Sequence, residues 1–298
     1  MGPASSERGR LCPARGSFRQ GGVRLTPELV DPYLKRLGLE REAPSAEALA
    51  RLHKAHAERV AYETVWIHSG SSWPIDPSVS IERLATTGRG GYCYHLNGAF
   101  SVLLEALGYD VTGHVGGVHG PDGPAEEAMS NHLVLQVAGL PTQANPGGHW
   151  YVDVGLGDAL HEPMPLVAGD RRQGVYELGL EATPGGVGDW HLSHDPSGSF
   201  SGMSWRSPVV TDMEGAFGQR HKLLSTSPDS GFVRVLTVQR RESDAVEILR
   251  GLSFKRLGVR PADTVIETPQ ELAAVLGDVF GLWPLPAGAE LAALWRGV

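Results

Sequence analysis

The apolar spacing of the chain changes near Gly108, and this change limits what the chain can fold into. Before it, apolar residues recur at the spacing of one helix face, as in the run that starts at Cys93 and continues through Leu96, Phe100, Leu103, Leu104 and Leu107. After it, short segments rich in β-branched and aromatic residues alternate with turns rich in Gly and Pro. Helices followed by an antiparallel block of strands predict an α+β fold.

Cap residues and strand patterns place the individual elements. Helices are expected from Asp31-Pro32 to Gly38, from a cap at Ser45, and from Ser80 to about Thr87. Strands are expected at residues 109–118, 132–138, 150–154, 175–180 and 190–193, and a long hairpin at 232–240 and 246–254, joined through 242–244. A capping box at Thr268-Pro269-Gln270-Glu271 predicts a last helix that ends near Phe280. Residues 1–24 lack periodicity and are expected to form a disordered extension.

Length and charge exclude several classes of function. A chain of 298 residues with 41% hydrophobic residues can bury a sizeable core. Its net charge of -8 argues against nucleic-acid binding, which needs a basic face. No apolar run reaches the roughly 18 residues of a membrane span, and the N-terminus has no signal-peptide core. We therefore expect a cytoplasmic protein with no nucleic-acid or membrane partner.

Cysteine and histidine usage argues against a bound metal. The two cysteines, Cys12 and Cys93, are too few for a disulfide framework or a thiolate zinc site, so Cys93 is expected to stay a free thiol. Two histidine pairs lack an accompanying His-Glu-x-x-His arrangement: His53 with His56, and His191 with His194. We therefore expect no metal site.

Cys93 follows a glycine turn and begins a helix, a placement that favours a nucleophile. A cysteine attacks as its thiolate, and the unpaired N–H groups and positive dipole end of a helix N-terminus favour that anion. His132 and Asp153, each in an expected strand, are the best candidates to take the thiol proton and to orient the imidazole. From these residues alone, Cys93 as a small buried residue, His132 as a core histidine and Asp153 as a turn residue stay open.

Several motifs, in order, resemble the arylamine N-acetyltransferase family. Residues 89–94, Arg-Gly-Gly-Tyr-Cys-Tyr, with Asn97 after them, resemble that family's active-site signature. The family's histidine strand is matched by Asn131-His132-Leu133, and its Val-Asp-Val-Gly-Phe-Gly segment by residues 152–157. Its Ile-Pro-Phe-Glu-Asn-Leu stretch is matched by residues 59–65, and the opening of its third subdomain by residues 223–228 followed by Phe232. The resemblance extends from about Leu29 to Leu252.

The resemblance implies a fold of three parts. These are a helical subdomain with the nucleophile at 25–108, a β-barrel-like subdomain with the histidine and the aspartate at 109–215, and an α/β lid at 216–298. It implies a Cys93, His132 and Asp153 triad. It also implies supporting roles for Arg89, Glu63 and Asn97, and a substrate pocket that includes Tyr62, Tyr94 and Leu156.

The activity that the resemblance implies is ping-pong acyl transfer. Cys93 would take the acyl group, normally from acetyl-CoA, and an arylamine, hydrazine or hydroxylamine would accept it, with no permanently bound cofactor. Leu156 stands where relatives carry a Phe beside the acceptor pocket, and the loop 140–150 is longer than usual. These departures keep open an amide synthase that releases a polyketide chain from an acyl carrier protein. A thiol hydrolase and a non-enzymatic binding module are further alternatives.

Two other features need a separate interpretation. His95 stands where bacterial relatives usually carry Glu, and two residues beyond Cys93 on a helix it should point away from the sulfur. We expect it in a supporting or a surface position. The basic pairs Arg240-Arg241 and Lys255-Arg256 are expected to form a solvated face rather than a site for CoA phosphates. The sequence does not determine the donor, the acceptor or the oligomeric state.

Overall fold

The computed structural model describes residues 27–298, so the predicted extension at 1–24 and Cys12 lie outside the described residues. The helices are α1 Pro27–Leu37, α2 Ala46–Arg59, α3 Val65–His68, α4 Pro77–Thr86, α5 Cys93–Ala106, α6 Met213–Thr226, α7 Gly231–Arg234, α8 Pro269–Ala274 and α9 Gly288–Arg296. A 3-10 turn covers Glu126–Ala128, and a π-helical turn, Val275–Val279, continues α8. None of the helices described has the length and apolar character needed to cross a membrane.

Within residues 27–298, thirteen strands form two antiparallel sheets. The strands are β1 Tyr62–Glu63, β2 Asp110–His119, β3 His132–Ala138, β4 Trp150–Val152, β5 Met164–Pro165, β6 Gly169–Gln173, β7 Tyr176–Ala182, β8 Trp190–Ser193, β9 Gly202–Val209, β10 Thr237–Arg241, β11 Ala245–Arg250, β12 Ser253–Gly258 and β13 Ala262–Val265. The larger sheet has the order β5-β4-β3-β2-β9-β8-β7-β6, and the smaller one β1-β10-β11-β12-β13.

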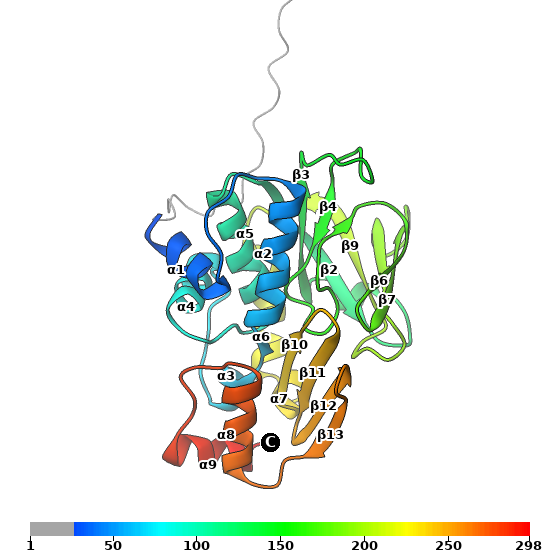
Figure 1. Cartoon of the computed structure of the whole chain (residues 1–298). Helices are drawn as coiled ribbons and strands as arrows, with labels where there is room; N and C mark the ends of the chain where they lie inside the picture. Colours follow the sequence, from blue (N-terminus) through cyan, green and yellow to red (C-terminus); the bar gives the residue numbers. More distant parts are fainter. Residues whose placement is uncertain (1–26) are drawn as a thin grey trace, which may run out of the picture.

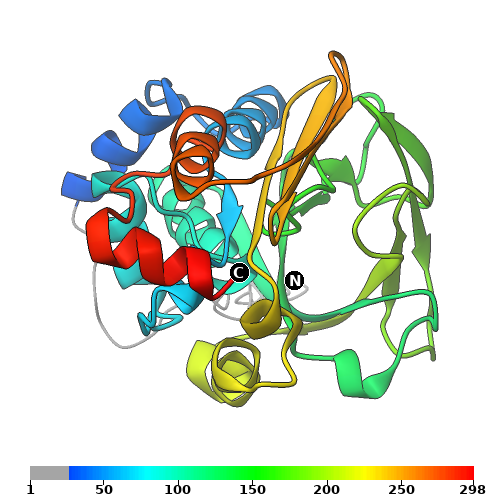
Figure 2. The ribbon, with the colours of Figure 1, turned by 90° about the horizontal axis from the view of Figure 1, so that it is seen from below.

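The helices and the two sheets occupy separate parts of the molecule. In Figure 1 the helices α1, α2, α4 and α5 lie on one side, the larger sheet curls on the other, and β10–β13 with α8 and α9 lie below both. Figure 2 shows the strands β10–β13 between the helices and the curled sheet. The predicted α+β class is confirmed.

Helix α5 is the centre of the helical part. All its residues from Cys93 to Leu104 are buried, and the helix packs on α4 and on strands β2 and β3. Phe100 lies edge-on to the rings of His53 and His56 of α2. Because α5 is covered on every side, its N-terminus presents Cys93 from a rigid support.

Two helices begin earlier than the sequence predicts. Helix α1 begins at Pro27, so Pro32 falls inside the helix and not at its first position. Burial of Val30, which is 1% exposed, extends the helix toward the N-terminus in spite of the N–H that Pro32 lacks. Helix α4 begins at Pro77 and not at Ser80, because Asp76 caps it by accepting a hydrogen bond from Ser78 N–H at 2.7 Å.

The candidate catalytic histidine, His132, lies on a buried strand of the larger sheet. In the β2–β3 pair, His132 lies opposite Gly116, and β3 is buried over most of its length. Three strands of the larger sheet, β5, β6 and β9, were not predicted, and β5 has only two residues. Strand β6 is polar and mostly exposed, and β9 contains Arg206, Ser207 and Pro208, so neither shows the alternation that marks a strand.

The predicted long hairpin is wrong in its ends. Residues 231–234 form the short helix α7, so strand β10 starts only at Thr237. The second predicted strand is split by a turn at Gly251, whose φ is 56°, into β11 and β12. The pairing of the two predicted strands is present, with Thr237 opposite Arg250. The predicted boundary between the second and third parts, between residues 215 and 216, falls inside helix α6. The subdomain boundaries stay predictions.

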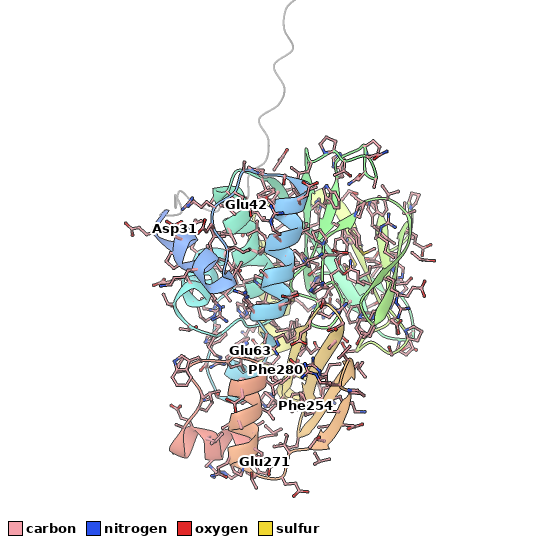
Figure 3. The ribbon with its side chains drawn as sticks, viewed as in Figure 1. Asp31, Glu42, Glu63, Phe254, Glu271 and Phe280 are labelled. Carbon is pink, nitrogen blue, oxygen red and sulfur yellow. The ribbon has the colours of Figure 1, made fainter. Side chains whose placement is uncertain are left out.

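The last predicted helix is present where expected. Thr268 accepts a hydrogen bond from Glu271 N–H at 3.2 Å and caps α8. The π-helical turn then carries the chain to Phe280. Phe280 meets Phe254 of β12 edge-on, with ring centroids 6.2 Å apart, and Figure 3 labels both. This contact packs the C-terminal helices on the smaller sheet.

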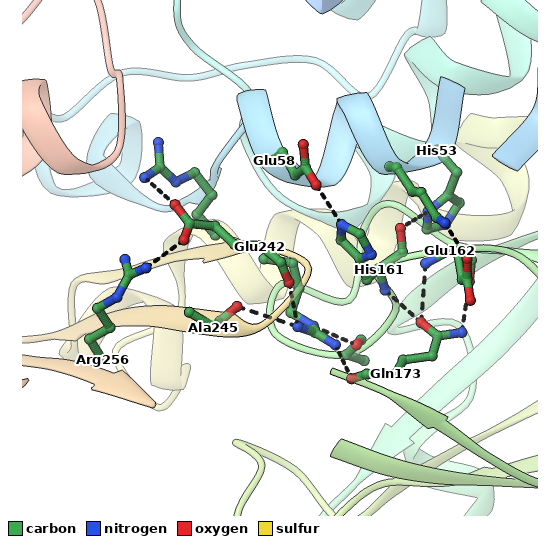
Figure 4. A network of polar contacts seen from close by, with 12 residues as sticks. His53, Glu58, His161, Glu162, Gln173, Glu242, Ala245 and Arg256 are labelled. Atoms are coloured by element: carbon green, nitrogen blue, oxygen red, sulfur yellow. Dashed lines mark hydrogen bonds and ion pairs between the residues drawn. The ribbon is translucent and has the colours of Figure 1, made fainter. Parts of the chain in front are cut away.

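Arg241 joins the smaller sheet to the larger one. Its side chain is 1% exposed, and its guanidinium donates to the carbonyl oxygens of Ala159 at 3.0 Å and Gln173 at 2.6 Å in the larger sheet's loops. It also donates to the carbonyls of Glu242 and Ala245 in its own hairpin, within the network of Figure 4. The smaller sheet is thereby held at the mouth of the site described below.

We expect Arg241→Met to lower the free energy of unfolding by about 3 kcal/mol, because buried carbonyls lose their donor. Urea unfolding followed by circular dichroism measures it. Arg172→Met, at an exposed position of β6, is the matched control. A loss for Arg241→Met no larger than for the control would contradict this role.

Candidate active site

A glycine turn delivers the chain to Cys93. Gly91 has φ of 82°, and a Cβ there would lie 2.5 Å from His95 Nδ1. That nitrogen accepts a hydrogen bond from Tyr92 N–H at 3.3 Å, which fixes the first turn of α5. His95 is fully buried, with its ring edge-on to that of Trp66. The surface alternative for His95 is therefore wrong, and His95 supports the turn.

Cys93, His132 and Asp153 converge from three different elements. Cys93 is the first residue of α5, His132 the first of β3, and Asp153 follows β4. His132 Nε2 lies 2.7 Å from Asp153 Oδ2, and each residue is 1% exposed. The thiol of Cys93 donates to the carbonyl oxygen of Asn131, the residue before His132, at 3.6 Å, and the side chains of Cys93 and His132 both line one cavity. Because Nε2 is bonded to Asp153, Nδ1 is the ring nitrogen left for the sulfur.

The carboxylate of Asp153 has donors on both oxygens. Oδ2 accepts from His132 and from Tyr151 OH, the latter at 3.0 Å. Oδ1 accepts from Asn97 Nδ2 at 2.7 Å and from Gly155 N–H at 3.0 Å. Four donors satisfy the hydrogen-bonding capacity of this buried carboxylate and fix its orientation.

The environment of His132 favours its charged form. Burial alone would lower the pKa of His132, but the charge of Asp153 and the hydrogen bonds to Asp153 and Cys93 outweigh burial and raise this pKa to about 10. His132 is therefore an imidazolium at neutral pH.

Asn97 ties the nucleophile helix to both of the other elements. Besides its bond to Asp153, its Nδ2 donates to Leu133 O at 2.6 Å, and its Oδ1 accepts from Val154 N–H at 2.9 Å. Gly155 lets this loop approach α5 closely, since a Cβ there would lie 2.9 Å from Cys93 Cα. The relative position of sulfur, imidazole and carboxylate is thus fixed by direct contacts.

Glu63 and Arg89 form the ion pair that the resemblance implies. Arg89 donates from Nε to Oε1 at 3.0 Å and from Nη2 to Oε2 at 3.2 Å, and Glu63, labelled in Figure 3, is fully buried. Glu63 N–H also donates to Gly91 O at 2.9 Å. The pair therefore connects β1 to the turn before Cys93.

A cavity of about 310 Å³ opens over the sulfur. Its lining combines the two sheets and α6–α7: Tyr62, Cys93, Val118, Asn131, His132, Gly155, Leu156, Ser199, Phe200, Leu224, Gly231, Phe232, Thr237, Gln239 and Arg250. Tyr62 and Leu156 lie in it, as predicted. Tyr94 does not, and this prediction is wrong. The Tyr94 ring is turned into the core, where its OH donates to Ser130 O at 2.5 Å.

Two buried residues behind the site were not predicted for it. Tyr151 lies two residues before Asp153, and the strand period of two, which puts both on one face, was a signal that could have identified it. His53 of α2 accepts from Asp153 N–H at 3.3 Å and bonds to His161 O at 3.0 Å. Burial lowers the pKa of His53 to about 4, so it is neutral. No local signal connects His53 with a residue that far along the chain.

The other histidines and the basic pairs are used structurally. Within residues 27–298, no three His, Cys, Asp or Glu side chains are grouped so that they could hold a metal ion. Of the basic pairs, Arg241 is buried, and Arg240 and Arg256 pair with Glu242 and Glu247. These three arginines do not form the solvated face that the sequence suggested, whereas Lys255 is exposed and pairs with Asp263.

Sequence comparison identifies the relatives of the chain. A family model for N-acetyltransferases matches residues 45–284. The pineal gland arylamine N-acetyltransferase isozyme NAT-3 of Gallus gallus is 28% identical over 282 residues, which cover 85% of this chain and 93% of that protein. Proansamycin X synthase of Amycolatopsis mediterranei is 33% identical over 146 residues, 46% of this chain and 52% of that protein.

The fold is shared with solved structures. Arylamine N-acetyltransferase from Salmonella typhimurium has a TM-score of 0.78 at 22% identity, covering 92% of this chain and all of that one. The Mycobacterium marinum enzyme in complex with CoA has a TM-score of 0.75 at 24% identity, covering 90% and 97%. With the sequence match over most of its length, the chain belongs to the arylamine N-acetyltransferase family of acyltransferase enzymes.

Proposed function

We propose that this enzyme transfers an acetyl group from acetyl-CoA through an acyl-Cys93 intermediate to an arylamine-type acceptor. The observation that carries the proposal is the bond between His132 and Asp153 at 2.7 Å, next to Cys93 and under a cavity that can admit both substrates in turn. Cys93 is the nucleophile, His132 the acid and base, and Asp153 the group that orients the imidazole.

In the first half-reaction, the Cys93 thiolate attacks the thioester carbonyl. A carbon–sulfur bond forms, and the oxyanion is stabilised by the N–H groups of Cys93 and Tyr94 at the start of α5, since those of His95 and Leu96 already donate to Tyr92 O. Collapse of this intermediate breaks the bond to CoA, and the leaving thiolate takes the proton of His132. The products are acyl-Cys93, free CoA and a neutral imidazole.

In the second half-reaction, the amine attacks the acyl-Cys93 carbonyl. An aromatic amine is mostly neutral at pH 7, so its lone pair is available without a strong base. The nitrogen–carbon bond forms, the amine proton passes to His132, and the sulfur leaves as thiolate. The cycle restores the thiolate and imidazolium pair and releases an amide.

Two observations support a CoA thioester as the acyl donor: a basic residue in the cavity lining, and a structural neighbour solved with CoA. Arg240, Arg241 and Arg256, members of the two basic pairs noted in the sequence, are hydrogen-bonded within the protein. A different basic residue, Arg250, lines the cavity. We propose that its guanidinium binds a phosphate of the donor. The M. marinum neighbour solved with CoA supports the same donor. We also propose a cytoplasmic location, because a reducing compartment preserves the free thiol of Cys93.

A second candidate function is amide synthesis from a carrier-bound polyketide. It is favoured by the similarity to proansamycin X synthase and by Leu156, a smaller side chain than Phe, in the cavity wall. Incubation with acetyl-CoA and, separately, with an acyl-carrier thioester distinguishes the two donors by the intact mass of the protein. Release of free acid without an amine would favour a thiol hydrolase.

We expect acetyl-CoA alone to add about 42 Da, one acetyl group, to the wild-type protein. Cys93→Ser should abolish both this label and acyl transfer while leaving the thermal unfolding curve in place, because a hydroxyl is not ionised by His132. Intact-mass spectrometry and CoA release measure the two effects. Substantial turnover by Cys93→Ser would refute the covalent route.

The raised pKa of His132 predicts a pH dependence of stability. Its pKa is about 10 in the folded protein, above its ordinary value of 6.5. The charged form therefore stabilises the fold fully below about pH 6.5, and this contribution is lost as the pH rises toward 10. For wild type we expect a loss of stability of about 4 kcal/mol across this window, and for Asp153→Asn a clearly flatter profile. Urea unfolding at pH 6, 8 and 10 measures both, and parallel profiles would contradict the assignment.

A further inference from the structure

One wall of the cavity carries polar groups that the acyl-transfer steps do not use. Ser199, in the turn between β8 and β9, and Gln239, on β10, both line the cavity that contains Cys93. Gln239 Nε2 donates to Ser199 Oγ at 3.1 Å, so the two side chains bridge the larger and the smaller sheet. We name this pair, with Asp158 behind it, the polar wall.

Asp158 fixes the direction of the Ser199 proton. The carboxylate is fully buried and accepts from Ser199 N–H at 2.8 Å, from Ser199 OH at 2.7 Å and from Tyr176 OH at 3.4 Å. Since an ionised carboxylate only accepts, the Ser199 hydroxyl must donate to it. One oxygen lone pair then accepts from Gln239, and the other is left for a ligand with a hydrogen-bond donor.

Gln239 is a buried side chain that does not use all of its hydrogen-bonding groups within the protein. It is 5% exposed and is pressed against the loop that follows Asp153, since a Cβ at Gly157 would collide with its Oε1. Among the described residues, the bond to Ser199 is the one hydrogen bond that its side chain makes. An amide has two N–H donors and a carbonyl acceptor, so a ligand in the cavity can pair with what remains.

The polar wall lies within reach of a substrate held at the sulfur. Ser199 and Gln239 line the same cavity of about 310 Å³ as Cys93, and Tyr62 contributes to its wall. The cavity wall next to the polar groups is apolar, formed by Leu156 and Phe200. This combination matches an aromatic ring with a polar group at its far end.

The polar wall is not a second catalytic serine site. The Ser199 hydroxyl is bonded to Asp158, and the imidazole beside that carboxylate, His194, has its Nε2 3.8 Å from Asp158 Oδ1. The proton of Ser199 is therefore held by a carboxylate and not by an imidazole base, which a serine nucleophile requires. What Ser199 offers is an oriented acceptor strengthened by a buried negative charge.

We infer that the polar wall is a specificity subsite for acceptors that carry a second hydrogen-bond donor, such as a hydroxyl, opposite the reacting amine. The inference rests on the proposed function and adds the class of acceptor. A donor at the far end of the ring bonds to Ser199 Oγ, whereas an isosteric methyl group leaves that oxygen and the Gln239 amide without a partner. Acceptors with a carboxylate in the same place are disfavoured by Asp158.

The test compares two acceptors, 4-aminophenol and 4-methylaniline. The first carries a hydroxyl group opposite the amine, and the second carries a methyl group of similar size in the same place. We expect the ratio of their kcat/KM values to fall about tenfold in Ser199→Ala, mainly because 4-aminophenol binds more weakly and its KM rises. The different reactivities of the two amines cancel when the ratio is compared between proteins. Ser199→Thr, which keeps the hydroxyl, should restore the ratio. Ser197→Ala, in the same turn with its hydroxyl on Asp195, should leave the ratio at the wild-type value.

Two further measurements separate this inference from the proposed function. Acyl-enzyme formation from acetyl-CoA, followed by mass, reports on the proposed function alone. Binding of the two amines to wild type and Ser199→Ala without any donor, by NMR titration, reports on the subsite alone, and we expect selective weakening for 4-aminophenol. Equal weakening for both amines, or an unchanged ratio, would overturn the inference and leave Ser199 as an anchor of its turn.

Discussion

The buried carboxylate of Asp153 is the constraint on which the site depends. A carboxyl group at 1% exposure is tolerated only when hydrogen-bond partners surround it, and Asp153 receives them from α5, β3, β4 and its own loop. Each donor fixes a different element against the others. The same charge raises the pKa of His132, so one group both assembles the site and sets the protonation of its base.

The three parts of the fold contribute differently to this centre. The helical part supplies a rigid N-terminus for Cys93, and the glycines at 91 and 155 let two backbones approach it where a Cβ would collide. The larger sheet supplies the histidine and the carboxylate. The smaller sheet, held by Arg241, supplies a cavity wall, so acceptor choice can vary through its side chains without disturbing the triad.

Much of the candidate site could be predicted from the sequence because its motifs consist of neighbouring residues. The glycine turn before Cys93, the histidine strand and the segment around Asp153 each predict one catalytic side chain, and the resemblance supplied the pairing of Arg89 with Glu63. The surface alternative for His95, and Tyr94 as a pocket residue, were wrong for one reason. Adjacent residues of a helix face different directions, and packing against Trp66 and Phe217 decides which faces are buried.

The sequence by itself determined the class of fold and which residues are predicted to react, since periodicity, caps and short motifs are properties of neighbouring residues. The tertiary structure alone decided which distant groups meet. His53 reaches the backbone of Asp153 across 100 residues, and Gln239 reaches Ser199 across 40. Such contacts arise when whole elements pack together. Burial requires each polar atom to have a hydrogen-bond partner, but no local sequence pattern specifies which distant residue that partner is.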